Sequence, residues 1–288
     1  MPAPRISFEF FPPQTLDASF RLWETVRMLA PLGPEFVSVT YGAGGTTRKL
    51  THEAVEAIGA NYGLNVAAHL TCVDASRAET LAVAHSYAEA GVTEIVALRG
   101  DPPRGEGRFA PRPDGFASSV ELVEALAATG RFRIRVGAYP EAHPDAPDMA
   151  ANVAWLKRKI EAGASSAITQ FFFEAESFFR FRDACERAGI DAPIIPGILP
   201  IISWSGARRF AERCGARVPE WLERAFATAA RDGREDLLAT ALATELCDDL
   251  LRGGVEDLHF YTLNRPHLTR DICFALGIAP EVSLQNVA

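Results

Sequence analysis

The chain has 288 residues, of which 48% are hydrophobic and 23% are charged, and its formal net charge is −8. These shares are typical of a soluble globular protein with ample material for a core, and the length suits one large α/β domain or two small ones. The acidic balance argues against a general nucleic-acid-binding protein, which would carry a basic surface.

Short apolar runs that are typical of strands alternate along the chain with patterns that are typical of helices. We expect strands at 6–11, 36–42, 65–72, 94–101, 135–140, 167–173, 194–200 and 258–264. Most of these runs are almost continuously apolar, which indicates strands covered on both faces. We expect helices at about 17–30, 51–62, 76–90, 117–129, 148–163, 176–188, 205–214, 218–231 and 234–252.

Local signals mark several helix ends. Asp17 is the expected N-cap of the first helix, and Ser76 with Glu79 three residues later has the pattern of a capping box. Gly91 and Gly163 stand where a helix ends in the left-handed conformation. Eight strand–helix alternations predict a (β/α)8 barrel, or TIM barrel, with extra helical elements near the C-terminus. A doubly wound sheet is the alternative, and we expect 1–288 to form a single catalytic domain without a regulatory domain.

Five scattered cysteines without a C-x-x-C pattern indicate a reducing compartment. The chain start lacks the apolar core of a signal peptide, and no apolar run approaches the ~18 residues of a membrane helix. We therefore expect a cytoplasmic protein that does not span a membrane. No spacing of His, Cys or acidic residues predicts a metal site.

The first predicted strand, "RISFEFFPP" (5–13), places Glu9 among phenylalanines. Burying an unpaired carboxylate is costly and favours its protonated form. A structural ion pair between Glu9 and an arginine inside the barrel is the alternative explanation.

Polar residues recur near the C-terminal ends of the predicted strands, where barrel enzymes carry their active sites. They are Glu9, Thr40, Tyr41, His69, Arg99, Asp101, Tyr139, Glu141, His143, Gln170, Tyr261, Asn264 and Arg265. This coincidence predicts one shared pocket, although each residue alone has a structural explanation, such as a core histidine at 69 or a local pair between Arg99 and Asp101. In the absence of a metal or nucleophile motif, the acids and aromatics indicate chemistry that an organic cofactor supplies.

The chain resembles the flavoprotein family of 5,10-methylenetetrahydrofolate reductases in nine strings that follow the family order. They are "SFEFFPP", "FVSVTYGA", "AHLTC", "IVALRGD", "AYPEAHP", "LKRKIEAGA", "AITQFFF", "IIPGILPI" and "HFYTLNR". Together they are highly specific and span residues 6–265. The resemblance is to the bacterial, single-domain type.

The resemblance implies a barrel that holds FAD and uses NADH or NADPH to reduce 5,10-methylenetetrahydrofolate to 5-methyltetrahydrofolate in a ping-pong reaction that feeds methionine synthesis. It also implies a homo-oligomer, with no nucleic-acid or membrane partner. Glu9 matches the family's general acid, and Asp101 matches the acid beside flavin and pterin. Gln170, Phe210 and Arg265 match substrate-binding residues.

The family's flavin contacts fall on one set of residues. They are Thr40, Tyr41, Ala43, His69, Arg99, Gly100, Asp101, Phe116, Ala117, Tyr139, His143, Asn152, Trp155, Arg158 and Lys159. Asn152 stands where the family carries a ribose-binding aspartate, and Gly206 stands where it carries a substrate-binding glutamine.

Two hypotheses from other classes compete with the reductase. One is a flavin-independent barrel enzyme, such as a pterin-binding methyltransferase or an aldolase. The other is a non-catalytic folate- or flavin-binding module.

Overall fold

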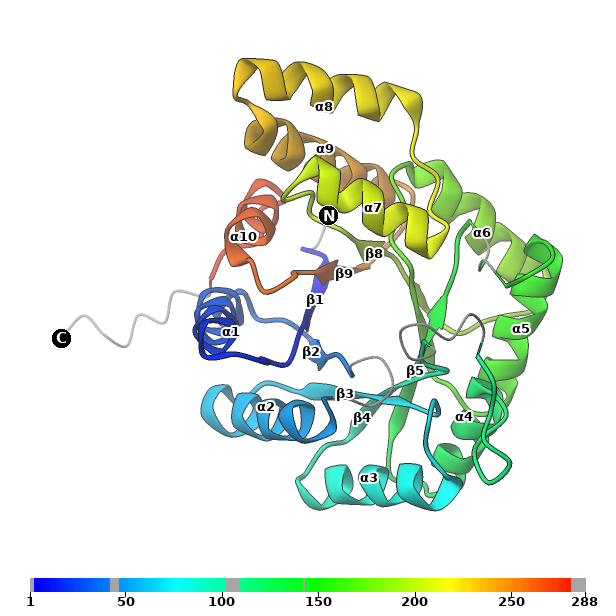
Figure 1. Cartoon of the computed structure of the whole chain (residues 1–288). Helices are drawn as coiled ribbons and strands as arrows, with labels where there is room; N and C mark the ends of the chain where they lie inside the picture. Colours follow the sequence, from blue (N-terminus) through cyan, green and yellow to red (C-terminus); the bar gives the residue numbers. More distant parts are fainter. Residues whose placement is uncertain (1–2, 42–46, 102–108, 142, 144, 281–288) are drawn as a thin grey trace.

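The computed structural model describes residues 3–41, 47–101, 109–141, 143 and 145–280. Its strands form one all-parallel sheet in the order β7-β6-β5-β4-β3-β2-β1-β9-β8. They are β1 (Arg5–Phe10), β2 (Phe36–Val39), β3 (Val66–Thr71), β4 (Glu94–Leu98), β5 (Arg133–Ala138), β6 (Ser166–Thr169), β7 (Ile194–Ile195), β8 (Gly197–Ile198) and β9 (Asp257–Tyr261). Figure 1 looks down the resulting barrel, with the helices around it.

The barrel closes through β7 and β8, which are separated only by Pro196. β7 pairs with β6, whereas β8 pairs with β9. Proline has no N–H to give to a ladder, but the Pro196 carbonyl accepts a hydrogen bond of 3.0 Å from the His259 N–H. The two short strands are therefore halves of the single barrel strand predicted at 194–200, and the (β/α)8 barrel prediction is confirmed.

Helices follow the strands around the barrel. They are α1 (Leu16–Leu29), α2 (Arg48–Tyr62), α3 (Arg77–Glu89), α4 (Ser119–Ala128), α5 (Met149–Glu161), α6 (Ala175–Arg187), α7 (Trp204–Cys214), α8 (Glu220–Asp232), α9 (Glu235–Arg252) and α10 (Pro266–Ala275), with a short 3-10 turn at Ala30–Leu32. The capping box of Ser76 and Glu79 is present at the start of α3. The prediction of Asp17 as N-cap of the first helix is wrong, because Thr15 takes that position and its side chain accepts the Ala18 N–H. Helix α10 was not among the predicted ranges.

Two apolar layers separate the sheet from the helices. The first packs β1, β2 and β9 against α1, α2, α9 and α10, and the second packs β3–β6 against α3–α6. The extra helices α7 and α8 add an apolar cluster of their own, in which the rings of Trp204 and Phe226 stack with centroids 4.8 Å apart. Figure 1 shows α8 outside the ring of barrel helices, so the predicted extra helical elements are confirmed.

Several predicted strands run past the observed ends at Val39, Leu98, Thr169 and Tyr261. The described residues beyond those ends leave the ladder at the carboxyl end of the barrel. Within the described ranges, no helix is long and apolar enough to cross a membrane.

Candidate active site

Strand β1 points Glu9 into the barrel because side chains alternate between the two faces of a strand. Phe8 and Phe10 face the helices and are 0% and 1% exposed. Ser7 and Glu9 face the other way, toward the barrel axis. Glu9 lies in register with Ser38 on β2 and Tyr261 on β9, so it stands at the carboxyl ends of all three strands. The phenylalanines around it in the sequence belong to the outer core.

Two histidines surround the Glu9 carboxylate. Its Oε2 atom lies 3.4 Å from Nε2 of His69 and 3.9 Å from Nε2 of His259. The Glu9 side chain is 15% exposed and that of His259 is 0% exposed. Burial lowers the pKa of His69, while the nearby Glu9 charge acts in the opposite direction. The cluster is therefore a carboxyl group held by buried imidazoles at the mouth of the barrel.

The arginine inside the barrel has another partner. Arg135 donates from Nε to Glu94 at 2.7 Å and from Nη1 to Ser166 at 3.0 Å. Its guanidinium also lies 3.7 Å from the ring centroid of Phe36. No guanidinium of the described chain lies within 4 Å of Glu9, so the structural ion pair considered as an alternative belongs to Glu94. This pair begins at the amino end of β4 and fills the opposite half of the barrel.

Tyr261, beside Glu9 on β9, links the mouth to the end of β6, near the predicted substrate residues Gln170 and Phe210. The Tyr261 hydroxyl donates to the Thr169 carbonyl at 2.6 Å, and burial raises its pKa well above the usual value, so it stays a neutral donor. Gln170 follows β6, and its side-chain oxygen accepts the Phe171 N–H at 3.0 Å. Phe210 on α7 packs against Phe171 with ring centroids 5.1 Å apart.

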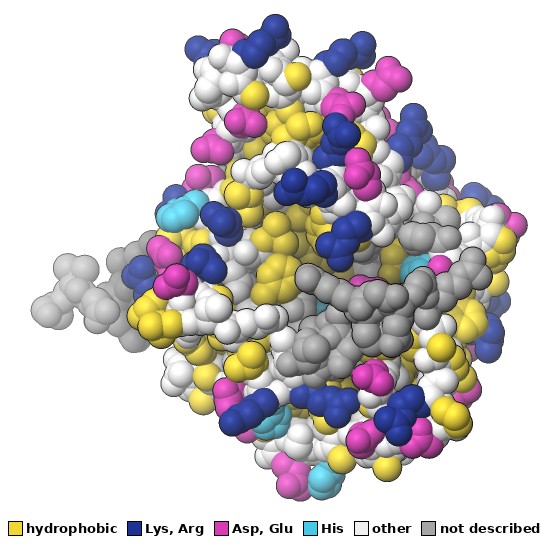
Figure 2. All heavy atoms as spheres, viewed as in Figure 1, with side chains coloured by type: hydrophobic (Ala, Val, Ile, Leu, Met, Phe, Trp, Pro, Cys, Tyr) yellow, Lys and Arg dark blue, Asp and Glu magenta, His cyan; other side chains and the backbone are white. Residues whose placement is uncertain are grey.

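Two further predicted residues are exposed at the rim. Asp101 follows the end of β4, and Arg265 is the residue before the first turn of α10. Figure 2 shows charged side chains of both signs around this face and hydrophobic side chains toward its middle. The rim is thus polar while the floor around Phe171 is apolar.

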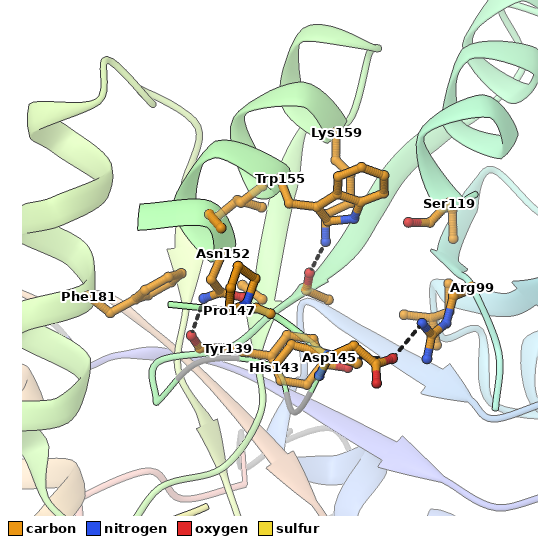
Figure 3. Close-up of a pocket in the computed structure, with 17 residues that line it drawn as sticks. Arg99, Ser119, Tyr139, His143, Asp145, Pro147, Asn152, Trp155, Lys159 and Phe181 are labelled. Carbon is orange, nitrogen blue, oxygen red and sulfur yellow. Dashed lines mark hydrogen bonds and ion pairs between the residues drawn. The ribbon is translucent and has the colours of Figure 1, made fainter. Parts of the chain in front are cut away.

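A cavity of about 310 Å³ lies beside the mouth, between the ends of β4 and β5 and helix α5 (Figure 3). Six predicted cofactor residues line it. They are Arg99, Tyr139, His143, Asn152, Trp155 and Lys159. The Asp148 side chain caps α5 by accepting the Ala151 N–H at 2.8 Å, which starts the helix where it can carry Asn152, Trp155 and Lys159 along one face.

Lys159 is a buried cation in this cavity. Its ammonium group donates to the carbonyl oxygen of Gly137, and no carboxylate of the described residues pairs with it. Burial lowers its pKa from 10.5 to about 8. A buried ammonium without a counter-ion is costly, so the site favours an anionic ligand.

Two more contacts organise the cavity. Arg99 pairs with Asp145 at 2.8 Å, and the Asn152 amide donates to the Tyr139 carbonyl at 2.7 Å. His143 stands edge-on to the Tyr139 ring with centroids 4.5 Å apart, and burial lowers its pKa. The cavity thus presents hydrogen-bonding groups and positively charged side chains.

Other predicted cofactor residues lie outside the lining of the cavity. Phe116 is buried beneath the guanidinium of Arg77, 4.7 Å away, and the Ala117 N–H is bonded to Glu121. Arg158 is exposed and lies 4.7 Å from the Trp155 ring centroid.

The remaining predicted cofactor residues follow β2 and β4. Thr40 and Tyr41 are half-buried after β2, and burial raises the pKa of Tyr41. Gly100 has φ +87° after β4. Ala43 lies outside the described residues. Within the described ranges, no group of three or more His, Cys, Asp and Glu side chains is arranged to hold a metal ion.

A family model described as methylenetetrahydrofolate reductase matches residues 2–277. The chain belongs to this family. It is 45% identical over 281 residues to the 5,10-methylenetetrahydrofolate reductase of Escherichia coli K12, which covers 96% of this chain and 91% of that protein. It is 36% identical over 293 residues to methylenetetrahydrofolate reductase (NADH) 1 of Arabidopsis thaliana, covering 97% of this chain and 49% of the plant protein. The resemblance noted in the sequence is thereby confirmed.

A solved structure shares the fold of this methylenetetrahydrofolate reductase family member. It is an uncharacterized protein from Clostridium thermocellum that binds two copies of 5-methyl-5,6,7,8-tetrahydrofolic acid. The TM-score is 0.60 at 13% identity, and the match covers 96% of this chain and 95% of that one. At this identity the likeness concerns the fold alone.

Sequence reasoning missed several residues at the site of this methylenetetrahydrofolate reductase family member. Ser119, Asp145, Pro147 and Phe181 line the cavity, and no local pattern distinguishes them from surface or core residues. His259 was not among the predicted site residues. The alternation of β9 carries a signal for it, because His259 is two residues before Tyr261 and must share its face.

Proposed function

We propose that the chain catalyses the reduction of 5,10-methylenetetrahydrofolate to 5-methyltetrahydrofolate, with FAD as cofactor and NADH or NADPH as reductant in a ping-pong order. The substrate is supported by the relatives, which are methylenetetrahydrofolate reductases. The observation that carries the proposal is the placement of Glu9 at the barrel mouth, beside imidazoles instead of a guanidinium. A carboxyl group in this position can serve as a general acid toward a substrate bound at the mouth.

The cavity beside the mouth fits the dinucleotide part of FAD. Lys159 is a buried ammonium that donates to a backbone carbonyl, and a diphosphate would supply the missing counter-ion. Arg99 would also bind the diphosphate, while Asn152, Tyr139 and His143 offer hydrogen bonds to hydroxyl groups. When bound, FAD would carry a hydride from the nicotinamide to the folate.

Glu9 would act on the five-membered ring of the folate substrate. It gives its proton to the ring nitrogen that leaves, and the electron pair of the breaking C–N bond stays on that nitrogen. The methylene carbon becomes a cationic iminium, and a hydride added to it makes the methyl group. One proton and one hydride are consumed in each turnover.

The other predicted residues would bind the folate substrate and stabilise the cation that forms from it. The negative charge of Asp101 favours the iminium cation electrostatically. Gln170 would hydrogen-bond the substrate ring, Phe210 would pack against the flat folate or nicotinamide, and Arg265 would bind substrate at the rim. A homo-oligomeric state and a cytoplasmic location stay predictions.

The experiment is anaerobic spectroscopy of the purified protein, which should be yellow, bleach with NADH or NADPH, and recover its colour on addition of 5,10-methylenetetrahydrofolate. Glu9→Gln should abolish the recovery by folate and leave the bleaching by reduced nicotinamide largely intact. Glu35→Gln, at the opposite end of the barrel, is the matched control and should change neither half-reaction.

The competing hypotheses predict other outcomes. A colourless protein that stays inactive after FAD addition would favour a flavin-independent barrel enzyme. Binding of flavin or folate without turnover, unchanged by Glu9→Gln, would favour a binding module. Equal loss of both half-reactions in the variant would contradict the role given to Glu9.

A further inference from the structure

A fully buried histidine stands behind Glu9 without a role in the proposed reaction. His259 is 0% exposed, and its Nε2 atom has no hydrogen-bond partner in the described part of the chain. That atom points at Oε2 of Glu9 from 3.9 Å. Because a buried polar atom without a partner is costly, its retention here calls for a reason.

The other ring nitrogen of His259 has a close partner. Ser7 Oγ lies 2.8 Å from Nδ1, whereas the Leu258 carbonyl is 3.4 Å from the same hydroxyl. A serine hydroxyl has one proton to donate, and the shorter contact has the usual length of a hydrogen bond. Assigning the Ser7 hydroxyl as the donor to Nδ1 places the ring proton on Nε2, facing Glu9, whereas the reverse assignment would let the hydroxyl donate to the Leu258 carbonyl and leave Nε2 without a proton.

We propose that His259 is a positioning residue for Glu9: held in one tautomer by Ser7, it presents Nε2–H to Oε2 of the carboxylate, beside Nε2 of His69. The proposal deepens the proposed function and rests on it. Both imidazoles approach the same oxygen, so Oε1 is left to carry the transferable proton toward the substrate. Hydrogen bonds of catalytic groups commonly tighten when substrate binds.

Imidazole N–H groups that face Glu9 favour its ionised form, and this affects the proton transfer. An N–H that points at a carboxylate stabilises its negative charge. After Glu9 has given its proton to the leaving nitrogen, the carboxylate that remains is stabilised by these donors. His259 thereby makes Glu9 a better proton donor without touching substrate.

Few other charged or titratable groups face this cluster. They are His69 on β3, Tyr261 on β9 with its ring centroid 5.3 Å from that of His259, and Arg135 on the far side of the Phe36 ring that stacks on His259. Arg135 is itself paired with Glu94 and Ser166, Ser38 adds a buried hydroxyl, and the other described interior side chains are mostly apolar. The apolar ones include Phe36, Ala67, Val96, Ile168 and Ile195.

The first test follows the pH dependence of the folate half-reaction in the flavin-loaded protein. That rate falls as pH rises, because Glu9 must be protonated. His259→Phe keeps an aromatic ring against Phe36 but removes the Nε2–H donor. Ser7→Ala removes the hydroxyl that fixes the tautomer of His259. In both variants, the pH at which the rate falls should rise by about one unit, which is the effect of losing a hydrogen bond to a charged group. The reduction of flavin by nicotinamide should not change.

Ser38→Ala is the matched control. It also deletes a fully buried hydroxyl in register with Glu9, and that hydroxyl has no hydrogen-bond partner among the described residues. It should leave the profile in place. A profile of His259→Phe that overlays the wild type, in a variant with wild-type circular dichroism, overturns the proposal.

The second test does not depend on turnover. Solid-state 15N NMR of histidine-labelled protein reports the tautomer of each of the six histidines, and the His259→Phe spectrum identifies the signal. We expect protonated Nε2, with a resonance that shifts in Glu9→Gln. Protonated Nδ1 would overturn the proposal even if the enzyme reduces folate. The expected tautomer in a protein without reductase activity would contradict the proposed function and leave the geometry of Ser7, His259 and Glu9 supported.

Discussion

Replacing Lys159 by methionine should make the cofactor-free protein more stable near neutral pH and weaken its binding of FAD. Burial lowers the pKa of Lys159 from 10.5 to about 8. The difference corresponds to about 3 kcal/mol of unfolding free energy, which the charged lysine costs the folded state below pH ~8. Loss of the hydrogen bond to the Gly137 carbonyl offsets about 1 kcal/mol. We therefore expect a net gain of about 2 kcal/mol at pH ~7.

The stability difference between Lys159→Met and the wild type should depend on pH. Between pH ~8 and ~10.5 the unfolded chain holds a proton on this lysine more often than the folded chain does, so the penalty fades as pH rises. The advantage of Lys159→Met should shrink through this window and nearly vanish at pH ~10, where a remaining penalty of about 1 kcal/mol is offset by the lost hydrogen bond. Urea denaturation at pH ~7 and ~10, followed by circular dichroism, measures both values.

Lys157→Met is the matched control. Lys157 lies on the same helix and also donates to a backbone carbonyl, that of Ala188 at 2.8 Å, but its side chain is 42% exposed. Its replacement should change the unfolding free energy by less than about 1 kcal/mol at both pH values. Equal stability of Lys159→Met and wild type at both pH values would refute the argument that this ammonium is buried at a cost.

Two other substitutions test the barrel. Arg135→Met leaves the buried Glu94 carboxylate without its main partner and should lower the unfolding free energy by about 3 kcal/mol in urea denaturation. The control is Arg133→Met, which removes a half-exposed partner 3.8 Å from Glu94 and should lower it by less than about 1 kcal/mol. Equal losses in the two variants would contradict the prediction. Gly100→Ala, at φ +87°, would put a Cβ 2.6 Å from a valine methyl and should cost about 2 kcal/mol or more in a thermal melt, well above Gly33→Ala, where nothing lies within 4 Å. Similar melting temperatures for the two alanine variants would count against a tight approach at Gly100.

Most of the architecture could be predicted from local patterns. Each predicted strand run overlaps an observed strand, because strands that are covered on both faces are largely apolar. Prediction failed at several strand ends, since the end of a ladder is set by pairing with the neighbouring strands and not by the composition of one run. It also failed at Asp17, because Thr15 and Asp17 are both good caps and the choice depends on how β1 enters the first helix.

The candidate site divides in the same way. Six of the predicted cofactor residues share one cavity, since the carboxyl ends of parallel strands and the amino ends of the helices that follow them lie at one face. Asp145 and Phe181 could not be found, because they reach the cavity only through the positions of a loop and a neighbouring helix.

The alternation within β1 by itself determined that Glu9 faces away from the phenylalanines beside it, because a period of two is a property of a single strand. Only the tertiary structure decided which groups meet Glu9 inside the barrel. His69 and His259 come from strands far apart in the chain, and Arg135 turns to Glu94. The register of parallel strands and the closure at Pro196 set those contacts, and both depend on all strands packing together.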